Sequence, residues 1–160
     1  MHTEAILLRT GTSQGIPVIG CDCPVCRSSD ERDKRLRASL LIRAGGMNFV
    51  IDAGPDFRQQ MLREHITSLR AILITHEHAD HIFGLDDVRS YNWLQKRPMD
   101  IYAEERVQKA VMRIFDYVFK DNGYPGIPRV KLTLIGKNPF DIDGIKFIPI
   151  RCYHHKLPVL

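Results

Sequence analysis

The alternation of apolar and polar positions along the chain predicts a series of short strands and three helices. Apolar runs of strand length cover residues 5–10, 38–42, 48–52, 71–74, 130–135 and 145–150. Gly45 and Gly46 lie between the second and third runs and predict a hairpin. Helical spacing predicts helices over residues 56–64, 85–94 and 104–119. Strands in pairs followed by helices indicate an α/β layered fold with a mixed sheet.

Length and composition fit one globular domain. The chain has 160 residues, of which 44% are hydrophobic, and its net charge is +4. No apolar run approaches the ~18 residues of a membrane span, and the N-terminus has no signal-peptide pattern, so we expect a cytoplasmic protein without a membrane partner. Basic residues within positions 30–37 are interleaved with acidic ones, which favours a solvated, turn-rich stretch over a nucleic-acid patch.

Three histidines and an aspartate stand within six residues, directly after the apolar run 71–74. Neutral imidazoles are good ligands for zinc and similar metals. His76 and His78 are two residues apart, so on extended backbone their side chains face one side and can hold one ion. Asp80 and His81 follow at the turn into the next helix and can hold a second. The spacing predicts a two-metal hydrolytic site. The alternatives are an exposed polar loop or a set of hydrogen-bonded core histidines.

A second cluster places Cys21, Cys23 and Cys26 on one short loop. Three thiolates so close supply most of a tetrahedral zinc site, with a fourth ligand from elsewhere. Such a zinc would be structural and would stabilise an insert over residues 20–37 that has few apolar side chains. The alternative is free cysteines in a turn. Cys152 stands alone in a predicted strand, where we expect it to belong to the core.

The pattern formed by His76, His78, Asp80 and His81, followed by Gly84, resembles the metallo-β-lactamase fold of hydrolases. The resemblance implies the αββα sandwich, in which two β-sheets pack together with helices on both outer faces. It implies that the first two histidines ligate one metal, whereas the Asp–His pair ligates the other. It also implies a catalytic role for Asp80, which would hold its ion and help to orient the nucleophile.

Further positions match the same family. Asp52 ends the run 48–52, where a family carboxylate orients a ligand histidine through its other ring nitrogen; a turn or capping role is the alternative. After the last predicted strand, the resemblance assigns His154 to the first metal, with His155 as the second choice. The loop over residues 9–17 is similar to an N-terminal loop of the phosphodiesterase branch, with a tight structural turn as the alternative.

The cysteine triplet narrows the resemblance to the phosphoribosyl cyclic phosphate phosphodiesterase group, which includes the bacterial C–P lyase pathway phosphodiesterase. Members carry zinc on three such cysteines and a C-terminal histidine. They continue with a metal-bridging aspartate and further histidines, so we expect residues 1–160 to form the N-terminal portion of one such domain, with a weakly ligated second ion. An incomplete sandwich leaves sheet surface uncovered, which favours association such as a homodimer.

We therefore expect a metal-dependent hydrolase that cleaves a phosphodiester, with a small cyclic phosphate as the implied substrate. It would use two divalent ions, zinc or manganese, and one structural zinc at the cysteines. A hydroxide bridging the two ions would attack phosphorus while the ions stabilise the developing charge. The alternatives are a tRNA 3′-processing endonuclease of the same fold, which the mixed charges support little, and a non-catalytic metal-binding module.

Overall fold

The computed structural model describes residues 2–120 and 125–160. The strands are β1 (Thr3–Arg9), β2 (Ser39–Ala44), β3 (Met47–Ile51), β4 (Ala71–Leu73), β5 (Met99–Ala103), β6 (Val130–Leu134), β7 (Phe140–Ile142), β8 (Ile145–Phe147), β9 (Cys152–His154) and β10 (Leu157–Val159). The α-helices are α1 (Pro24–Arg27), α2 (Phe57–Arg63), α3 (Ala79–Ile82), α4 (Arg89–Gln95), α5 (Glu105–Ile114) and α6 (Asp116–Phe119). Two short 3₁₀ helices are η1 (Glu31–Asp33) and η2 (Leu85–Val88).

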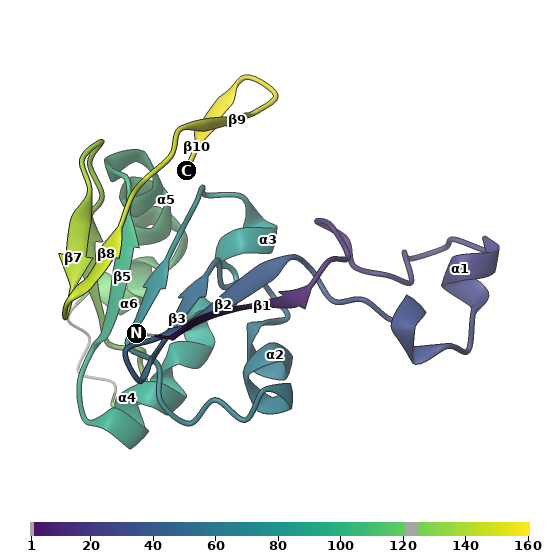
Figure 1. Ribbon diagram of the computed structural model, residues 1–160, viewed down its shortest axis with the longest axis horizontal. Helices are drawn as coiled ribbons and strands as arrows, with labels where there is room; N and C mark the ends of the chain where they lie inside the picture. Colours follow the sequence, from purple (N-terminus) through teal and green to yellow (C-terminus); the bar gives the residue numbers. More distant parts are fainter. Residues whose placement is uncertain (1, 121–124) are drawn as a thin grey trace.

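Strands β1 to β6 form one mixed sheet in which the spatial order follows the sequence (Figure 1). The first three strands pair antiparallel, whereas β3, β4, β5 and β6 run parallel. The predicted hairpin is confirmed: Ala44 pairs with Met47 across Gly45 and Gly46, and both glycines have positive φ. Helices connect the parallel strands, so the carboxyl ends of those strands lie along one edge of the sheet.

Alternate side chains of the sheet enter two separate cores. Val50 and Ile72 point into the larger core, which the helices cover, whereas Phe49 and Ala71 point into a smaller core on the other face. The β7–β8 hairpin covers the smaller core, where the rings of Phe49 and Phe147 meet edge to face with centroids 5.2 Å apart. Because both faces are buried, β3 and β4 are apolar at nearly every position, as is typical of parallel strands.

The α/β class expected from the sequence is confirmed by the mixed sheet and the helices between its parallel strands. A helical layer packs on the six-stranded sheet (Figure 1). Among the described residues, the opposite side is represented by two small antiparallel pairs, β7–β8 and β9–β10. The structure therefore contains one helix-covered sheet and a limited part of the second half of the sandwich.

Several boundaries differ from the predictions. Strand β5 was not predicted, because Asp100 interrupts its apolar run and only pairing with β4 and β6 makes it a strand. The helix predicted over residues 104–119 is interrupted at Phe115, where φ is −106° and ψ is 42°, and it resumes as α6. The last predicted strand ends at Phe147. The prediction that Cys152 is a core residue is wrong, because β9 projects from the sheet and Cys152 is exposed.

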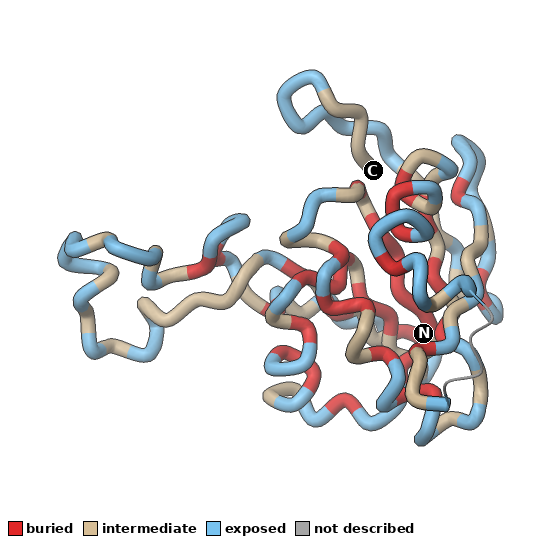
Figure 2. The backbone as a smooth tube through the Cα atoms, turned by 180° about the vertical axis from the view of Figure 1, so that it is seen from behind, coloured by how far each residue is buried: buried red, intermediate tan, exposed pale blue. Residues whose placement is uncertain are grey.

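Residues 10–38 form an arm that extends from the body and carries α1 (Figure 1). Its outer part is exposed or half-buried, whereas Gly11 and Gly15 are buried near its start (Figure 2). There, Gly11 donates its backbone N–H to Leu36 O at 2.9 Å, and a Cβ on Gly11 would lie 2.3 Å from Arg35 O. The close approach supports the structural-turn interpretation of this loop. Within residues 2–120 and 125–160, no helix is long and apolar enough to cross a membrane.

Candidate metal centre

The centre begins at Asp52, which follows β3 at the edge where the parallel strands end. Its backbone N–H donates to Leu73 O at 2.9 Å, which continues the pairing of β3 with β4. Asp52 then adopts a left-handed φ of 64° and is only 6% exposed. Its carboxylate accepts hydrogen bonds from Thr75 N and Thr75 Oγ1, both at 2.8 Å, and lies 2.7 Å from His81 Nδ1. One buried carboxylate thus connects the ends of two strands to a candidate ligand.

Two glycines allow the loop after β3 to contact the histidine segment directly. A Cβ on Gly54 would lie 2.0 Å from Asp80 O, and a Cβ on Gly84 would lie 2.1 Å from Gly54 O. At this separation Ala53 donates its N–H to His81 O at 2.8 Å, and Gly84 donates its N–H to Ala53 O at 2.9 Å. Only residues without a side chain permit this approach, so the glycines determine where α3 lies.

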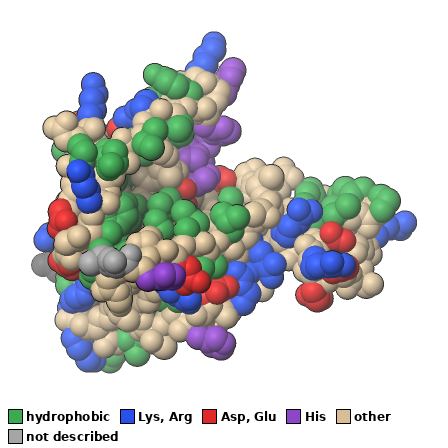
Figure 3. All heavy atoms as spheres, in the orientation of Figure 1, with side chains coloured by type: hydrophobic (Ala, Val, Ile, Leu, Met, Phe, Trp, Pro, Cys, Tyr) green, Lys and Arg blue, Asp and Glu red, His purple; other side chains and the backbone are tan. Residues whose placement is uncertain are grey.

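Three histidines from two distant parts of the chain converge above this edge. His76, His78 and His154 each offer a ring nitrogen, and the three nitrogens lie within 4.8 Å of one another. His76 Nε2 lies 3.2 Å from His78 Nδ1, and the His154 ring centroid is 5.7 Å and 5.4 Å from the centroids of these two rings. Figure 3 shows histidine side chains gathered between the body and the β9–β10 hairpin. This arrangement matches a three-nitrogen site for one divalent ion.

The structure distinguishes the two candidates for the third histidine. His154 ends β9 and belongs to the group of three, whereas His155 occupies the hairpin turn with φ of 56°. Among the described residues, no potential metal group of three ligands includes His155. Binding of a metal by His76, His78 and His154 stays a prediction.

Asp80 and His81 lie beside the three histidines. Asp80 Oδ2 is 3.2 Å from His81 Nε2, and the rings of His76 and His81 have centroids 3.9 Å apart. The pair therefore offers one carboxylate oxygen and one imidazole nitrogen toward the same point, next to the first group. These two donors agree with the expectation of a second, weakly ligated ion, which likewise stays a prediction.

Burial and charge set the protonation of the two inner histidines. Desolvation, reinforced by the neighbouring His81, lowers the pKa of His76 to about 4, so this imidazole is neutral at pH 7. For His81, burial acts to lower the pKa, but the hydrogen bond to Asp52 and the charges of Asp52 and Asp80 raise it overall. A neutral His76 offers a lone pair to a cation. His81 carries a proton on Nδ1 toward Asp52, which leaves Nε2 directed at Asp80.

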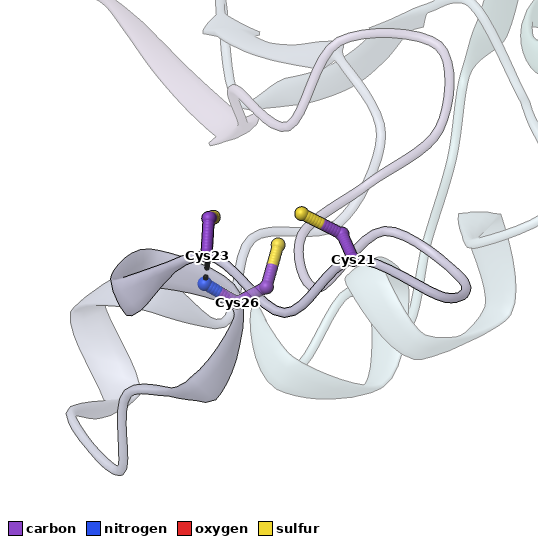
Figure 4. Close-up of side chains that lie close together, drawn as sticks. All are labelled: Cys21, Cys23 and Cys26. Atoms are coloured by element: carbon purple, nitrogen blue, oxygen red, sulfur yellow. Dashed lines mark hydrogen bonds between the residues drawn. The ribbon is translucent and has the colours of Figure 1, made fainter.

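The three cysteines of the arm also converge, and all are free thiols (Figure 4). Their sulfurs lie within 4.8 Å of one another. Val18 N donates to Cys26 Sγ at 3.4 Å, and Cys26 N donates to Cys23 Sγ at 3.5 Å. The latter bond is the main reason that the pKa of Cys23 is lowered. For Cys26 the Val18 N–H acts to lower the pKa, but hydrogen bonding and charge from the neighbouring thiols, together with desolvation, raise it overall. The geometry fits three ligands of a structural zinc, whose binding stays a prediction.

Sequence analysis missed two residues that support the centre. Thr75 donates its hydroxyl hydrogen to Asp52, and its Oγ1 lies 2.9 Å from His76 Nδ1. Thr75 therefore connects the Asp52 carboxylate to a second histidine by hydrogen bonds. Its position between an apolar strand and a histidine motif is a signal that could have indicated this role. Arg106 of α5 donates a hydrogen bond to Glu77, which lies between His76 and His78. Because the two residues are 29 positions apart, no local sequence pattern indicates this contact.

Comparisons with known proteins identify relatives of this chain. A family described as "Beta-lactamase superfamily domain" matches residues 47–158. An octanoyltransferase from Porphyromonas gingivalis is 47% identical over 159 residues, which is 98% of this chain and 32% of that protein. The coenzyme PQQ synthesis protein B of Methylobacterium nodulans is 28% identical over 134 residues, which is 74% of this chain and 43% of that protein.

Solved structures extend the likeness to nearly the whole chain. The crystal structure of a diphosphatase from the PhnP family superposes with a TM-score of 0.89 and 38% identity, covering 99% of this chain and 60% of that one. Zn²⁺-bound PqqB from Methylobacterium extorquens superposes with a TM-score of 0.71 and 21% identity, covering 92% of this chain and 55% of that one, and it shares the fold. The chain spans less than two thirds of the length of these relatives, from 32% to 60%.

Proposed function

The chain belongs to the beta-lactamase superfamily, and from this premise we propose that it carries the metal-binding part of a hydrolase that cleaves a phosphodiester. One observation carries the proposal: three ring nitrogens, from His76, His78 and His154, lie within 4.8 Å of one another. A solvated polar loop would not bring a histidine 76 residues further along the chain onto the His76–His78 pair. The alternative of an exposed polar loop has no comparable support.

The residues present fit a divalent ion. The low pKa of His76 keeps its imidazole neutral, and Thr75 and Asp52 accept from the ring nitrogens that face away from the cluster. This is the arrangement by which proteins orient metal-ligating histidines. A divalent ion bound there would act as a Lewis acid toward a phosphoryl oxygen.

The chain itself supplies position and charge. His76, His78 and His154 would hold the first ion, and Asp80 with His81 would contribute to a second. Asp52 keeps the proton of neutral His81 on Nδ1, so that Nε2, which faces Asp80, carries the lone pair. We assign Asp80 the role of orienting the attacking water, because its carboxylate faces the histidine cluster and can accept a hydrogen bond from that water.

Two substrate classes follow from the observations. The cysteine triplet of the arm supports a small phosphodiester, because the phosphodiesterase group that it resembles carries the same pattern. The PhnP-family diphosphatase at 38% identity supports a phosphoanhydride as the second candidate. Both substrates require stabilisation of negative charge on phosphoryl oxygens, so the same ligands serve either reaction.

Elemental analysis and hydrolysis assays test the proposal together. The purified chain, loaded with zinc or manganese, is assayed with bis-p-nitrophenyl phosphate as the phosphodiester and with a dinucleoside diphosphate as the phosphoanhydride. We expect metal content above that of the cysteine site, but only slow hydrolysis, because Asp80 and His81 by themselves bind the second ion weakly. His76→Ala should abolish this hydrolysis, whereas His65→Ala, outside the cluster, should leave it unchanged. Metal confined to the cysteines, with identical rates for the wild type and His76→Ala, would refute the proposal.

A further inference from the structure

The hairpin that carries His154 has almost no core of its own. All three residues of β9 are exposed, and β10 is half-buried along its length. Tyr153, the largest side chain of β9, is 71% exposed. The hairpin also projects from the body (Figure 1). Because β9 is exposed and β10 is only half-buried, apolar packing of the hairpin is limited, and polar contacts contribute to holding His154 beside the other two histidines.

These contacts come mostly from the first turn of α5. Arg106 donates from Nη2 to Pro158 O in β10 at 2.7 Å. Glu104, which precedes α5, accepts from Arg151 Nη1 at 2.8 Å, at the start of the hairpin. At the other end, Leu160 donates its N–H to Thr75 O at 3.4 Å, a longer and weaker bond.

Arg106 differs from the other contacts because it joins both parts of the ligand set. Its Nη1 forms a hydrogen-bonded ion pair with Glu77, the residue between His76 and His78. Its Nη2 binds Pro158, which pairs with Tyr153, the neighbour of His154. One guanidinium therefore connects the segment that carries two candidate ligands to the strand pair that carries the third.

The chemistry of this contact requires arginine. A guanidinium is planar and presents two outward N–H groups, so it can serve two acceptors at once, whereas a lysine ammonium acts as a point charge. Glu77 depends on the contact, because its Oε2 is buried and has no hydrogen-bond partner among the described residues. The side chains of Arg106 and Glu77 are 36% and 23% exposed, so the pair is partly shielded from water.

We propose that Arg106 is a positioning residue of the metal centre, which restrains the β9–β10 hairpin so that His154 lies within ligand distance of His76 and His78. The metal in this proposal rests on the proposed function. The restraint of the hairpin does not, since it is a property of the metal-free chain.

Amide hydrogen exchange of the metal-free chain tests the restraint. In Arg106→Ala we expect exchange over residues 152–160 to accelerate by about 10–100-fold, the effect of losing one hydrogen bond from a charged donor. Arg106→Lys keeps a positive charge beside Glu77 and should therefore keep the fold. It should still accelerate amide exchange over residues 152–160, because lysine cannot also donate to Pro158 O. Lys109→Ala is the matched control: Lys109 lies one turn along α5, pairs with Glu105 at 2.6 Å, and should leave the segment unchanged.

Zinc titration monitored by imidazole ¹⁵N shifts tests the consequence for the ligands. We expect Arg106→Ala and Arg106→Lys to weaken zinc binding by about 10–100-fold, as for other residues that support metal ligands. The His154 resonance should shift later in the titration than those of His76 and His78. Zinc taken up by the cysteine site is the same in every variant, so the imidazole shifts are compared at equal zinc added beyond that site.

The possible outcomes separate the two proposals. Unchanged exchange over residues 152–160 in both Arg106 variants would overturn the positioning role, whatever the zinc result. Accelerated exchange with wild-type zinc affinity would also overturn it, because the hairpin would then reach the ion without restraint. If the wild-type histidines bind no zinc, the proposed function fails, whereas the exchange measurement still decides whether Arg106 restrains the hairpin.

Discussion

Replacing Asp52 with asparagine should invert the protonation pattern of two candidate metal ligands and leave the fold intact. Asp52 accepts from His81 Nδ1 at 2.7 Å and from Thr75 Oγ1 at 2.8 Å, and Thr75 Oγ1 in turn lies 2.9 Å from His76 Nδ1. Because the threonine hydroxyl donates to the carboxylate, it must accept from His76. In their neutral forms both rings therefore carry their proton on Nδ1, and the lone pair is on Nε2.

An asparagine side chain reverses this relay. If its oxygen still accepts from Thr75 N, its NH₂ group faces the threonine hydroxyl and His81 Nδ1. The threonine hydroxyl, now accepting, is free to donate to His76 Nδ1. Both imidazoles then move their proton to Nε2, the nitrogen needed for a metal. Zinc affinity should fall by about 10–100-fold, equivalent to ~1.4–2.7 kcal/mol.

Stability should respond differently from metal affinity. Asparagine tolerates the left-handed φ of 64° at this position and retains the bond to Thr75 N. We expect the free energy of unfolding to fall by about 1–2 kcal/mol, because hydrogen bonds to a charged group are replaced by neutral ones. Asp52→Ala should cost ~2–5 kcal/mol, since it leaves a buried N–H unpaired and adds strain at positive φ.

Long-range ¹H–¹⁵N correlations of the metal-free histidines report the tautomers directly, and urea unfolding with zinc titration measures the two energies. The expected result for Asp52→Asn is Nε2–H in both His76 and His81, with weak zinc binding by a folded chain. If both rings keep Nδ1–H, or if zinc affinity is unchanged despite the altered tautomers, the relay described above is wrong.

Three further predictions test other parts of the structure. Gly84→Ala places a Cβ about 2 Å from a facing carbonyl oxygen; overpacking of ~1–3 kcal/mol should lower the melting temperature by roughly 2–12 °C, and an unchanged melting curve would contradict this contact. Cys23→Ser should lower the zinc content of the purified chain by one equivalent and increase proteolysis of the arm, whereas Cys152→Ser should change neither. His154→Ala should weaken zinc binding at the histidine cluster and His155→Ala should not; equal effects in a calorimetric titration would show that the ligand is misassigned.

Much of the sheet and half of the site could be predicted from local sequence. The apolar runs of β3 and β4 are buried on both faces, so their pattern is strong without any knowledge of partners. His76 and His78 face one side because they are two residues apart on extended backbone. The three cysteines converge because their loop is too short to separate them.

Other elements lack such a local signal. Strand β5 contains Asp100, whose carboxylate pairs with Arg70 at 2.5 Å, and this charged residue interrupts the apolar pattern expected of a buried strand. The hairpin of β9 and β10 has little apolar periodicity because β9 is exposed and β10 is only half-buried. A short sequence window contains neither the partner strand nor the ion pair, so propensity alone could not assign either element.

By itself, the sequence therefore determined the α/β class, the two clusters of ligand side chains and the chemistry that they favour. The resemblance already named His154 before His155 and assigned Asp52 an orienting role. The tertiary structure decided that His154 joins His76 and His78, that Thr75 links Asp52 to His76, and that Arg106 binds the hairpin. The physical reason is the sequence separation over which each kind of interaction acts. Alternation and spacing act over a few residues, whereas these contacts join positions 23 to 78 residues apart, and only the packing of the sheet and its hairpin brings these side chains together.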